Sequence, residues 1–256
     1  MKKRLIAIFT VLLIVAVVVI LNSAVFTLQK AEIYFYNEEG NLAQAPSGLS
    51  SAALIEDYLG HNIFFLSEKD LIASIEAKAQ YSDYYVVGVV RHFPDVVSVH
   101  LAARVPVFYL NKGGVGYLLD IKGFVVSSGQ SYSSKYINIS GNFSSGVTNI
   151  EEHSQIVLGK DAQTRYDYIQ KSASTVWRLN YDYSEISQII EGFLFEGDDV
   201  TVITKTGAKI VIQKAETDYE KRFIKALGVY SNTSLDVKGS GSVITVDEKG
   251  RVTTTK

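Results

Sequence analysis

The N-terminal apolar run is the feature that most constrains this chain. A short basic tail, residues 1–4, is followed by residues 5–26, which are apolar except for Thr10, Asn22 and Ser23. A helix needs ~20 mostly apolar residues to span the hydrocarbon of a bilayer. The sequence therefore predicts a single transmembrane helix over 5–26.

A cleaved signal peptide is the alternative interpretation of this segment. Its apolar core would be ~7–15 residues long and would end at a small-x-small cleavage site. The run here is longer, and Asn22-Ser23-Ala24 is a poor site because Asn22 is large and polar. Basic residues stay on the cytoplasmic side of a membrane. We therefore expect a single-pass protein of the cell membrane, with its N-terminus in the cytoplasm and its C-terminal bulk extracytoplasmic.

Composition and charge exclude several classes of function. The 256 residues contain no cysteine, which excludes a disulfide scaffold, thiolate metal sites and a cysteine nucleophile. Lys and Arg number 25 against 27 Asp and Glu; without the basic residues of 1–4 the balance is 22 to 27, a net charge of −5. A body of that sign is a poor partner for nucleic-acid phosphates.

The residues after the apolar run predict a small module, 28–105, in the order strand, helix, helix, strand, strand. Aromatic and β-branched residues predict strands at 31–36, 84–91 and 96–104. Residues 37–50 predict a loop. Ser51 is positioned to cap a first helix, and Ser67 with Asp70 forms the Ser-x-x-Asp signal that starts a second helix.

A longer, sheet-rich region with two helices follows, over 106–247. Helical periodicity predicts the helices at 161–179 and 218–230. Short apolar runs predict strands at 107–110, 116–119, 124–126, 137–139, 186–195, 200–204, 209–213, 234–237 and 242–246. Asp120 and Gly123 mark a turn. The last residues, 248–256, predict a polar tail. The predicted fold class is α+β, with a transmembrane helix at its N-terminus.

No catalytic or metal site stands out in the sequence. The four histidines have no metal-ligand spacing. The cluster Gly113-Gly114-Val115-Gly116 lacks the Lys-Ser/Thr of a phosphate loop, and a hairpin turn explains it better. A Ser–Lys hydrolase is the remaining enzyme hypothesis, but no Ser lies in a Gly-x-Ser-x-Gly or Ser-x-x-Lys motif. We expect a protein that is not an enzyme and that needs no cofactor and no metal.

Four stretches of the chain form an ordered set of motifs. They are Gly60-His61-Asn62-Ile63-Phe64-Phe65-Leu66; Arg91-His92-Phe93-Pro94 through Val99 with Arg104-Val105-Pro106-Val107; Tyr117-Leu118-Leu119-Asp120-Ile121-Lys122-Gly123; and Glu220-Lys221-Arg222-Phe223 with Leu235-Asp236-Val237-Lys238. In this order they resemble the motifs of the FtsQ/DivIB family of bacterial cell-division proteins. Phe93, Ala103 and Lys238 stand where the family usually has Trp, Glu and Arg. The chain thus resembles a divergent member of the family.

The resemblance implies both a fold and a function. The fold is a POTRA domain (β-α-α-β-β) over 28–105, followed by a β-domain over 106–247. The function is that of a non-enzymatic, bitopic membrane scaffold of the divisome. Such a scaffold links single-pass division proteins of the FtsL and FtsB/DivIC type at the division septum.

The resemblance also implies a partner-binding strand, the last strand of the β-domain. A last strand followed only by a polar tail leaves unpaired N–H and C=O groups that a partner strand can use. The implied site is made of Lys238, Ser242, Val243, Ile244, Thr245 and Val246. In it, Val243, Ile244 and Val246 supply apolar contacts and Lys238 pairs with a partner carboxylate. The alternative function is an anchored POTRA-bearing chaperone or secretion component for exported polypeptides.

Overall fold

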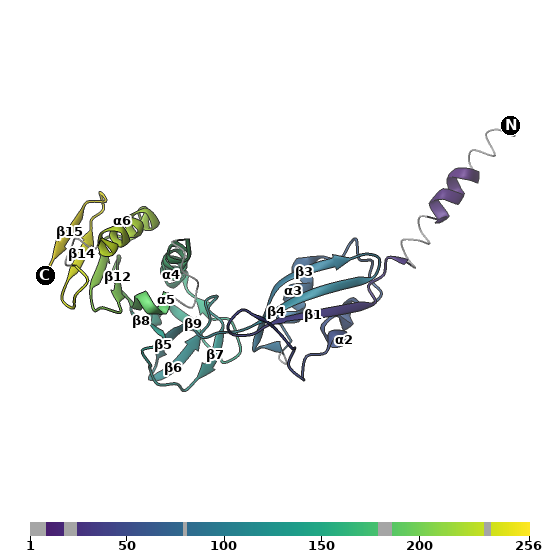
Figure 1. Ribbon diagram of the computed structural model, residues 1–256, viewed down its shortest axis with the longest axis horizontal. Coiled ribbons are helices and arrows are strands. Elements are labelled where there is room, and N and C mark those ends of the chain that lie inside the picture. Colours follow the sequence, from purple (N-terminus) through teal and green to yellow (C-terminus); the bar gives the residue numbers. More distant parts are fainter. Residues whose placement is uncertain (1–8, 18–24, 79–80, 179–185, 233–236) are drawn as a thin grey trace. The chain divides into compact units, whose positions relative to one another are not determined.

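The chain folds into two units that each combine a sheet with helices. The structure is a computed structural model that describes residues 9–17, 25–78, 81–178, 186–232 and 237–256. The units are Met1–Arg104 and Val105–Lys256 (Figure 1). The division lies one residue before the predicted boundary. The fold class is α+β with a sheet-rich body.

The prediction of a transmembrane helix over 5–26 is wrong. Among the residues that the structure describes, no helix combines the length and the apolar character needed to cross a membrane. The described helical stretch within the predicted segment is 9–17. Residues 5–8 and 18–24 of the segment lie outside the described residues. The predicted single-pass location in the cell membrane depended on this helix, and it is corrected with it.

The first unit is built on a four-stranded sheet with the strand order β2-β1-β4-β3. In chain order its elements are β1 (Lys30–Tyr36), β2 (Leu42–Ala43), α2 (Ser51–Leu54), the 3-10 helix η2 (Glu56–Tyr58), α3 (Glu68–Glu76), β3 (Tyr84–His92) and β4 (Val96–Ala103). Strand β1 is parallel to β4, and β3 is antiparallel to it. Helix α2 packs on β1 and α3 packs on β3. Both helices share one apolar core with the sheet, in which Leu54, Leu71 and Val99 are fully buried.

The two helices of the first unit begin at serine caps. The Ser67 hydroxyl accepts the N–H of Asp70 at 3.3 Å, as the Ser-x-x-Asp signal predicted. The first helix is capped by Ser50 and not by Ser51: the Ser50 hydroxyl accepts the N–H of Ala53 at 3.4 Å. Sequence patterns place such ends only to within a residue or two.

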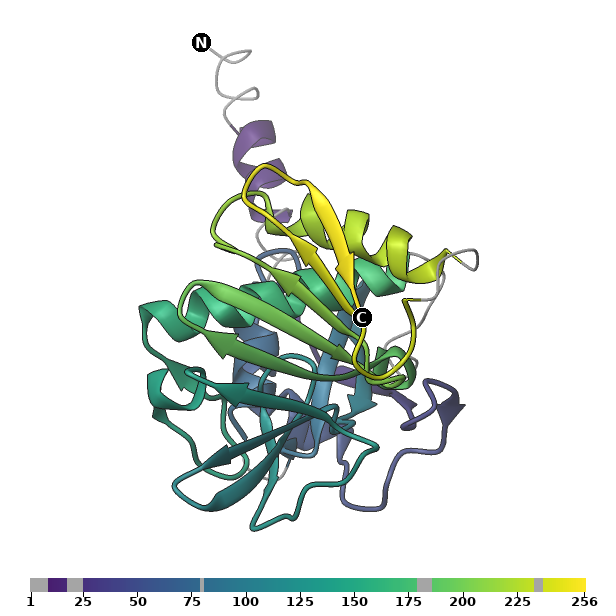
Figure 2. The same ribbon diagram turned by 90° about the vertical axis from the view of Figure 1, so that its left-hand side faces the viewer.

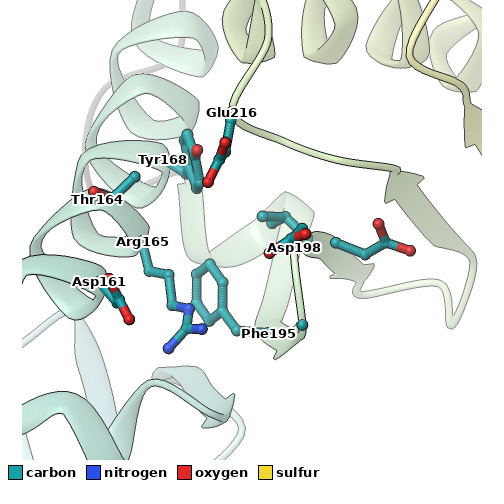
Figure 3. Close-up of a pocket in the computed structure, with 10 residues that line it drawn as sticks. Asp161, Thr164, Arg165, Tyr168, Phe195, Asp198 and Glu216 are labelled. Carbon is teal, nitrogen blue, oxygen red and sulfur yellow. The ribbon is translucent and has the colours of Figure 1, made fainter.

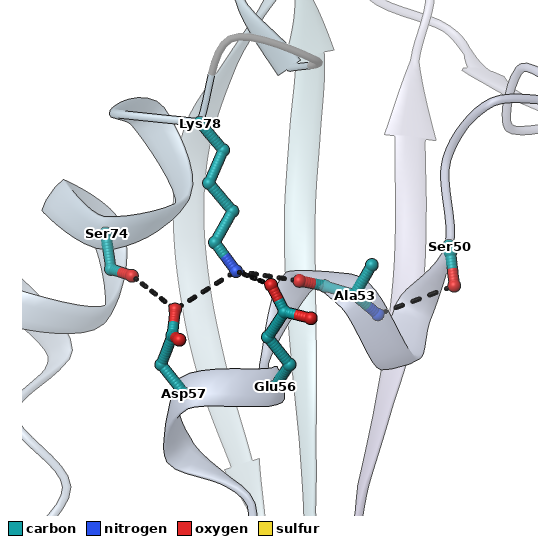
Figure 4. Close-up of polar contacts among 6 residues, drawn as sticks. All are labelled: Ser50, Ala53, Glu56, Asp57, Ser74 and Lys78. Carbon is teal, nitrogen blue, oxygen red and sulfur yellow. Dashed lines mark hydrogen bonds and ion pairs between the residues drawn. The ribbon is translucent and has the colours of Figure 1, made fainter.

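Lys78 ties the two helical segments of the first unit together (Figure 4). Its ammonium group donates to the carbonyl of Ala53 at 2.8 Å and lies 3.1 Å from a carboxylate oxygen of both Glu56 and Asp57. The hydroxyl of Ser74 on α3 donates to Asp57 at 3.4 Å. Burial lowers the pKa of Lys78, but its hydrogen bonds and charge pairing with Glu56 and Asp57 outweigh this and raise it.

The second unit is built on a nine-stranded sheet with the strand order β15-β14-β13-β12-β11-β8-β5-β6-β7. Its strands and helices, in chain order, are β5 (Phe108–Lys112), β6 (Val115–Leu119), β7 (Val125–Ser128), β8 (Ile137–Gly141), η4 (Ser144–Gly146), β9 (Val147–Asn149), β10 (Val157–Leu158), α4 (Lys160–Arg178), α5 (Ile186–Ile189), β11 (Ile190–Glu196), β12 (Asp199–Thr204), β13 (Lys209–Ile212), α6 (Tyr219–Ser231), β14 (Val243–Val246) and β15 (Val252–Thr255). Strands β9 and β10 pair only with each other. The strand predicted at 234–237, with Leu235 and Asp236, lies almost entirely outside the described residues.

Helices α4 and α6 lie next to each other along one face of this sheet (Figure 2). Their apolar residues share one core with the strands, including Ile169, Phe223, Phe193 and Ile210. At the C-terminal side, α6 packs on β13 and β14. Strand β15 lies at one edge of the sheet, and β7 lies at the other.

Candidate partner-binding edge

The predicted partner-binding strand is in the interior of the sheet. Strand β14 pairs in parallel with β13 on one side, with Ile210 opposite Ile244. On its other side it pairs antiparallel with β15, with Thr254 opposite Ile244. A strand that is paired on both sides has no free backbone groups for a partner. The open edge that was predicted at residues 242–246 therefore lies one strand further out, at β15.

The side chains of the predicted site fall into two groups. Ile244 and Val246 are fully buried in the core and Ser242 is 2% exposed, so these side chains do not reach the surface of the folded unit. Val243 and Thr245 are half-buried on the opposite face of the strand. This alternation follows from the period of two along a strand. Ile244 and Val246 pack in the core of the second unit, so they do not supply the apolar partner contacts that were predicted for them.

Lys238 lies close to helix α6. Its ammonium nitrogen is 5.7 Å from the centroid of the Tyr230 ring, a cation–π distance. A short segment leads from Lys238 to the start of β14. In this segment the N–H of Ser242 donates to the carbonyl of Gly239 at 3.1 Å. The predicted pairing of Lys238 with a partner carboxylate stays a prediction.

A tight hairpin made by Asp247 joins β14 to β15. One carboxylate oxygen of Asp247 accepts the N–H groups of Lys249 and Arg251, each at 2.9 Å, and the other accepts the Arg251 side chain at 2.6 Å. Gly250 has a positive φ of 71°, which few residues other than glycine adopt. The backbone and side-chain hydrogen bonds from Arg251 hold the pKa of the Asp247 carboxyl below its ordinary value, against a smaller effect of desolvation.

The outward-facing groups of β15 follow from the hydrogen-bond pattern. Asp247 donates its N–H to the carbonyl of Arg251 at 3.1 Å. Hydrogen-bonded pairs alternate along an antiparallel ladder, and the register places Thr253 opposite Thr245 and Thr255 opposite Val243. Thr253 and Thr255 therefore bond to β14. The N–H and C=O groups of Val252 and Thr254 point away from the sheet, where an added strand would find them.

The opposite edge of the same sheet is covered. Val125 in β7 exchanges backbone hydrogen bonds with the segment that follows β9: its N–H donates to Ser154 and its carbonyl accepts from His153, both at 2.9 Å. The Ser128 N–H donates to the carboxylate of Glu152 at 3.3 Å. Loops that cover an edge in this way prevent unwanted pairing. Of the two edges, β15 is the one on which the described chain places no further strand or loop.

Arg222 of helix α6 connects the end of β14 to the rest of the unit. It is only 3% exposed, and its guanidinium donates to the carbonyls of Gln213, Lys214, Thr217 and Asp247. The resemblance included Arg222 in its helix motif without giving it a role. The sequence could not predict this role of Arg222, because its hydrogen-bond acceptors are backbone carbonyls, which every residue has.

Searches for known relatives do not place the chain in a family. No family model matches the sequence, and no curated protein matches it. The resemblance to the FtsQ/DivIB family therefore stays a prediction.

Proposed function

We propose that this chain is a non-enzymatic scaffold of the bacterial division machinery that captures a partner strand at the outer edge of β15. The observation that carries the proposal is the edge itself: β15 is a short terminal strand with outward N–H and C=O groups at Val252 and Thr254. Main-chain hydrogen bonds to such groups give affinity to an extended peptide of suitable sequence.

The composition of β15 supports addition of another protein over pairing with a second copy. The strand Val252–Thr255 is flanked by Arg251 and Lys256. A second copy that paired antiparallel through the outward groups of Val252 and Thr254 would bring Arg251 of one copy to the same end of the strand pair as Lys256 of the other, although not directly opposite it. Two positive charges at each end of such a pair repel each other. Charges at strand ends are a common protection against self-association.

The first unit supports the same proposal through its topology. Its elements run strand, helix, helix, strand, strand, apart from the two-residue β2, and its first and last strands are parallel neighbours. This is the order that the resemblance to a POTRA domain implies. The partners implied by the same resemblance are division proteins of the FtsL and FtsB/DivIC type.

Co-purification tests the proposal. The full chain is produced together with the FtsL-type and FtsB/DivIC-type proteins of the same organism, and the complex is isolated through a tag on this chain. We expect all three proteins to be recovered, and we expect a chain ending at Arg251, which lacks β15, to lose the partners. Equal recovery by the shortened chain would contradict capture at β15. Recovery of unfolded polypeptides alone would favour the chaperone alternative.

A further inference from the structure

A cavity of about 190 Å³ lies in the second unit between α4, the turn from β11 to β12 and the loop before α6 (Figure 3). Three exposed carboxylates line it, those of Asp161, Asp198 and Glu216, together with the side chain of Arg165. The guanidinium of Arg165 donates to the carbonyl of Asn142 at 2.8 Å. Charges that are exposed to water are screened, so they do not make this cavity a selective site.

A more specific feature is the open edge that strand β3 forms in the sheet of the first unit (Figure 1). The strand spans nine residues, Tyr84–His92, and in the order β2-β1-β4-β3 it pairs with β4 alone. From Tyr84 to Val90 it has no charged residue, and the side chains of Val87 and Val90 are 57% and 47% exposed. Long apolar strands at the edge of a sheet tend to pair with other chains. Such an edge therefore needs protection if the chain is to stay free.

The hydrogen-bond pattern decides which backbone groups of β3 point away from the sheet. The N–H of Arg104 donates to the carbonyl of Asp83 at 2.9 Å, so these two residues form a hydrogen-bonded pair. Hydrogen-bonded pairs alternate along an antiparallel ladder, and the register shifts by one residue at a bulge at Val87. The residues whose N–H and C=O groups point outward are therefore Tyr84, Val86, Val89 and Arg91.

The carboxylate of Glu76 occupies one of these outward groups. It accepts the N–H of Val86 at 3.0 Å. Glu76 is the last residue of α3, where a negative charge is unfavourable because the C-terminal end of the helix dipole is itself negative. The helix therefore gives no reason for an acid at this position, whereas the hydrogen bond to β3 does. The outward groups of Val89 and Arg91 have no backbone partner among the described residues.

The outer edge of β3 is complementary to itself. If two copies paired antiparallel about a two-fold axis, Val86 of one copy would lie opposite Val89 of the other, and Tyr84 opposite Arg91. Each outward residue would then meet an outward residue, as a ladder requires. The charge of Arg91 would face a tyrosine and not a like charge, so nothing in the strand itself opposes this pairing.

We propose that the Glu76 carboxylate protects the edge of β3 from pairing with the β3 of a second copy of this chain. It takes the Val86 N–H that such a pair requires, and it holds a negative charge beside the edge. A charge-assisted hydrogen bond must break before a second copy can bond there. The inference goes beyond the proposed function and does not depend on it, because it concerns the first unit only.

Site-specific cross-linking of the full chain tests this protection, because the chain has no cysteine of its own. The two-fold axis of the pair would pass between Val87 and Gly88. Two cysteines introduced by Val87→Cys would lie about 7 Å apart, as diagonal neighbours in an antiparallel pair do, and a short bismaleimide would join them. We expect at least about fivefold more cross-linked dimer with Glu76→Ala/Val87→Cys than with Val87→Cys alone, because the hydrogen bond to Val86 is lost.

Two matched variants separate this pairing from unspecific association. Glu76→Gln keeps a side-chain oxygen that can accept the Val86 N–H, so with Val87→Cys it should give less dimer than Glu76→Ala does. Lys69→Cys places the cysteine on the exposed side of α3 and should give no dimer in the Glu76→Ala chain. Equal dimer yields with and without Glu76→Ala would overturn the proposal. Equal yields at positions 69 and 87 in the Glu76→Ala chain would overturn it as well.

Discussion

Arg222 is the residue that most directly connects the C-terminal hairpin to the body of the second unit. Its guanidinium reaches three carbonyls of the segment between β13 and α6, those of Gln213, Lys214 and Thr217, and it reaches Asp247 at 3.3 Å. A buried cation is tolerated only where hydrogen bonds compensate its desolvation. Removing it would leave buried carbonyls without donors, and each unsatisfied group costs free energy.

The variant Arg222→Met tests this role. We expect it to lower the free energy of unfolding by about 3 kcal/mol, because several charge-assisted hydrogen bonds are lost while the apolar stem is retained. Lys221→Met is the matched control: Lys221 is exposed, and its one ion pair, with Asp218, is long at 3.8 Å. Chemical denaturation of the full-length variants gives both values. Equal stabilities of the two variants would contradict the structural role of Arg222.

Asp247 gives the hairpin a dependence on pH. Its pKa is lower in the folded chain than its ordinary value, so the carboxylate stabilises the hairpin at pH values above the ordinary carboxyl pKa of ~3.9. This contribution is lost as the pH falls through the lowered folded value. We expect the amide shifts of Lys249 and Arg251 to stay constant down to about pH 4 and to change only below it.

The variant Asp247→Asn separates charge from geometry at this turn. Asn retains the side-chain oxygen that accepts the N–H groups of Lys249 and Arg251, so the hairpin should form without the acidic transition. Asp247→Ala removes the acceptor, and the hairpin amides should lose protection from hydrogen exchange. Protection that is unchanged in the alanine variant would show that Asp247 does not build the turn.

At the scale of elements, local signals predicted much of the fold. Ser67 with Asp70 marks the start of α3, and the carboxylate of Asp120 accepts two N–H groups, of Lys122 and Phe124, at 2.8 Å in the predicted turn. The predicted helices at 161–179 and 218–230 agree closely with α4 and α6. These signals depend on neighbouring residues only, so they can be read without knowing the fold.

Strand β15 was missed because its own residues are polar. Thr253, Thr254 and Thr255 show no alternation of apolar and polar residues, so the segment was predicted as a tail. The signal was the turn before it: Asp247-x-x-Gly250 repeats the pattern of Asp120-x-x-Gly123, which was recognised as a turn. The edge of the sheet was predicted one strand too far inside for the same reason. The transmembrane helix was predicted from the apolar length of residues 5–26, and no helix among the described residues is long and apolar enough to cross a membrane.

The contacts of Lys78 with Ala53, Glu56 and Asp57, which join two helical segments of the first unit, give a further prediction at the scale of elements. Lys78→Met should destabilise the full chain by about 1 kcal/mol, because the partners Glu56 and Asp57 are themselves largely exposed. Lys69→Met, on the exposed side of α3, is the control and should change stability by less than about 0.5 kcal/mol. Hydrogen exchange of α2 should rise in the first variant only. Equal rates of hydrogen exchange for α2 in Lys78→Met and Lys69→Met would contradict the role of Lys78 in holding the helical segments together.

At the scale of the whole molecule, each unit has a core of its own. The core around Leu71 and Val99 contains only residues before the division at Arg104, and the core around Phe193 and Ile210 only residues after it. Separate cores are the property of units that can fold separately. This organisation allows the second unit to form the edge at β15, where we propose partner binding, without help from the first.

Separate production of residues 25–104 and 105–256 tests this independence. We expect each fragment to give a dispersed NMR spectrum whose peaks overlay those of the full chain, except near the division. A fragment with a collapsed spectrum would show that its core needs the other unit.

The central claim is that a partner strand bonds to the outer edge of β15, and the substitution Thr254→Pro tests it most directly. Proline removes the outward N–H of Thr254 and leaves the inward bonds of Thr253 and Thr255 to β14 in place. Thr254→Val keeps the N–H and serves as the control. The measurement is the affinity of each full chain for the FtsB/DivIC-type protein of the same organism, by calorimetry. The account predicts a loss of at least about tenfold for proline and none for valine; equal affinities of the two variants would contradict it.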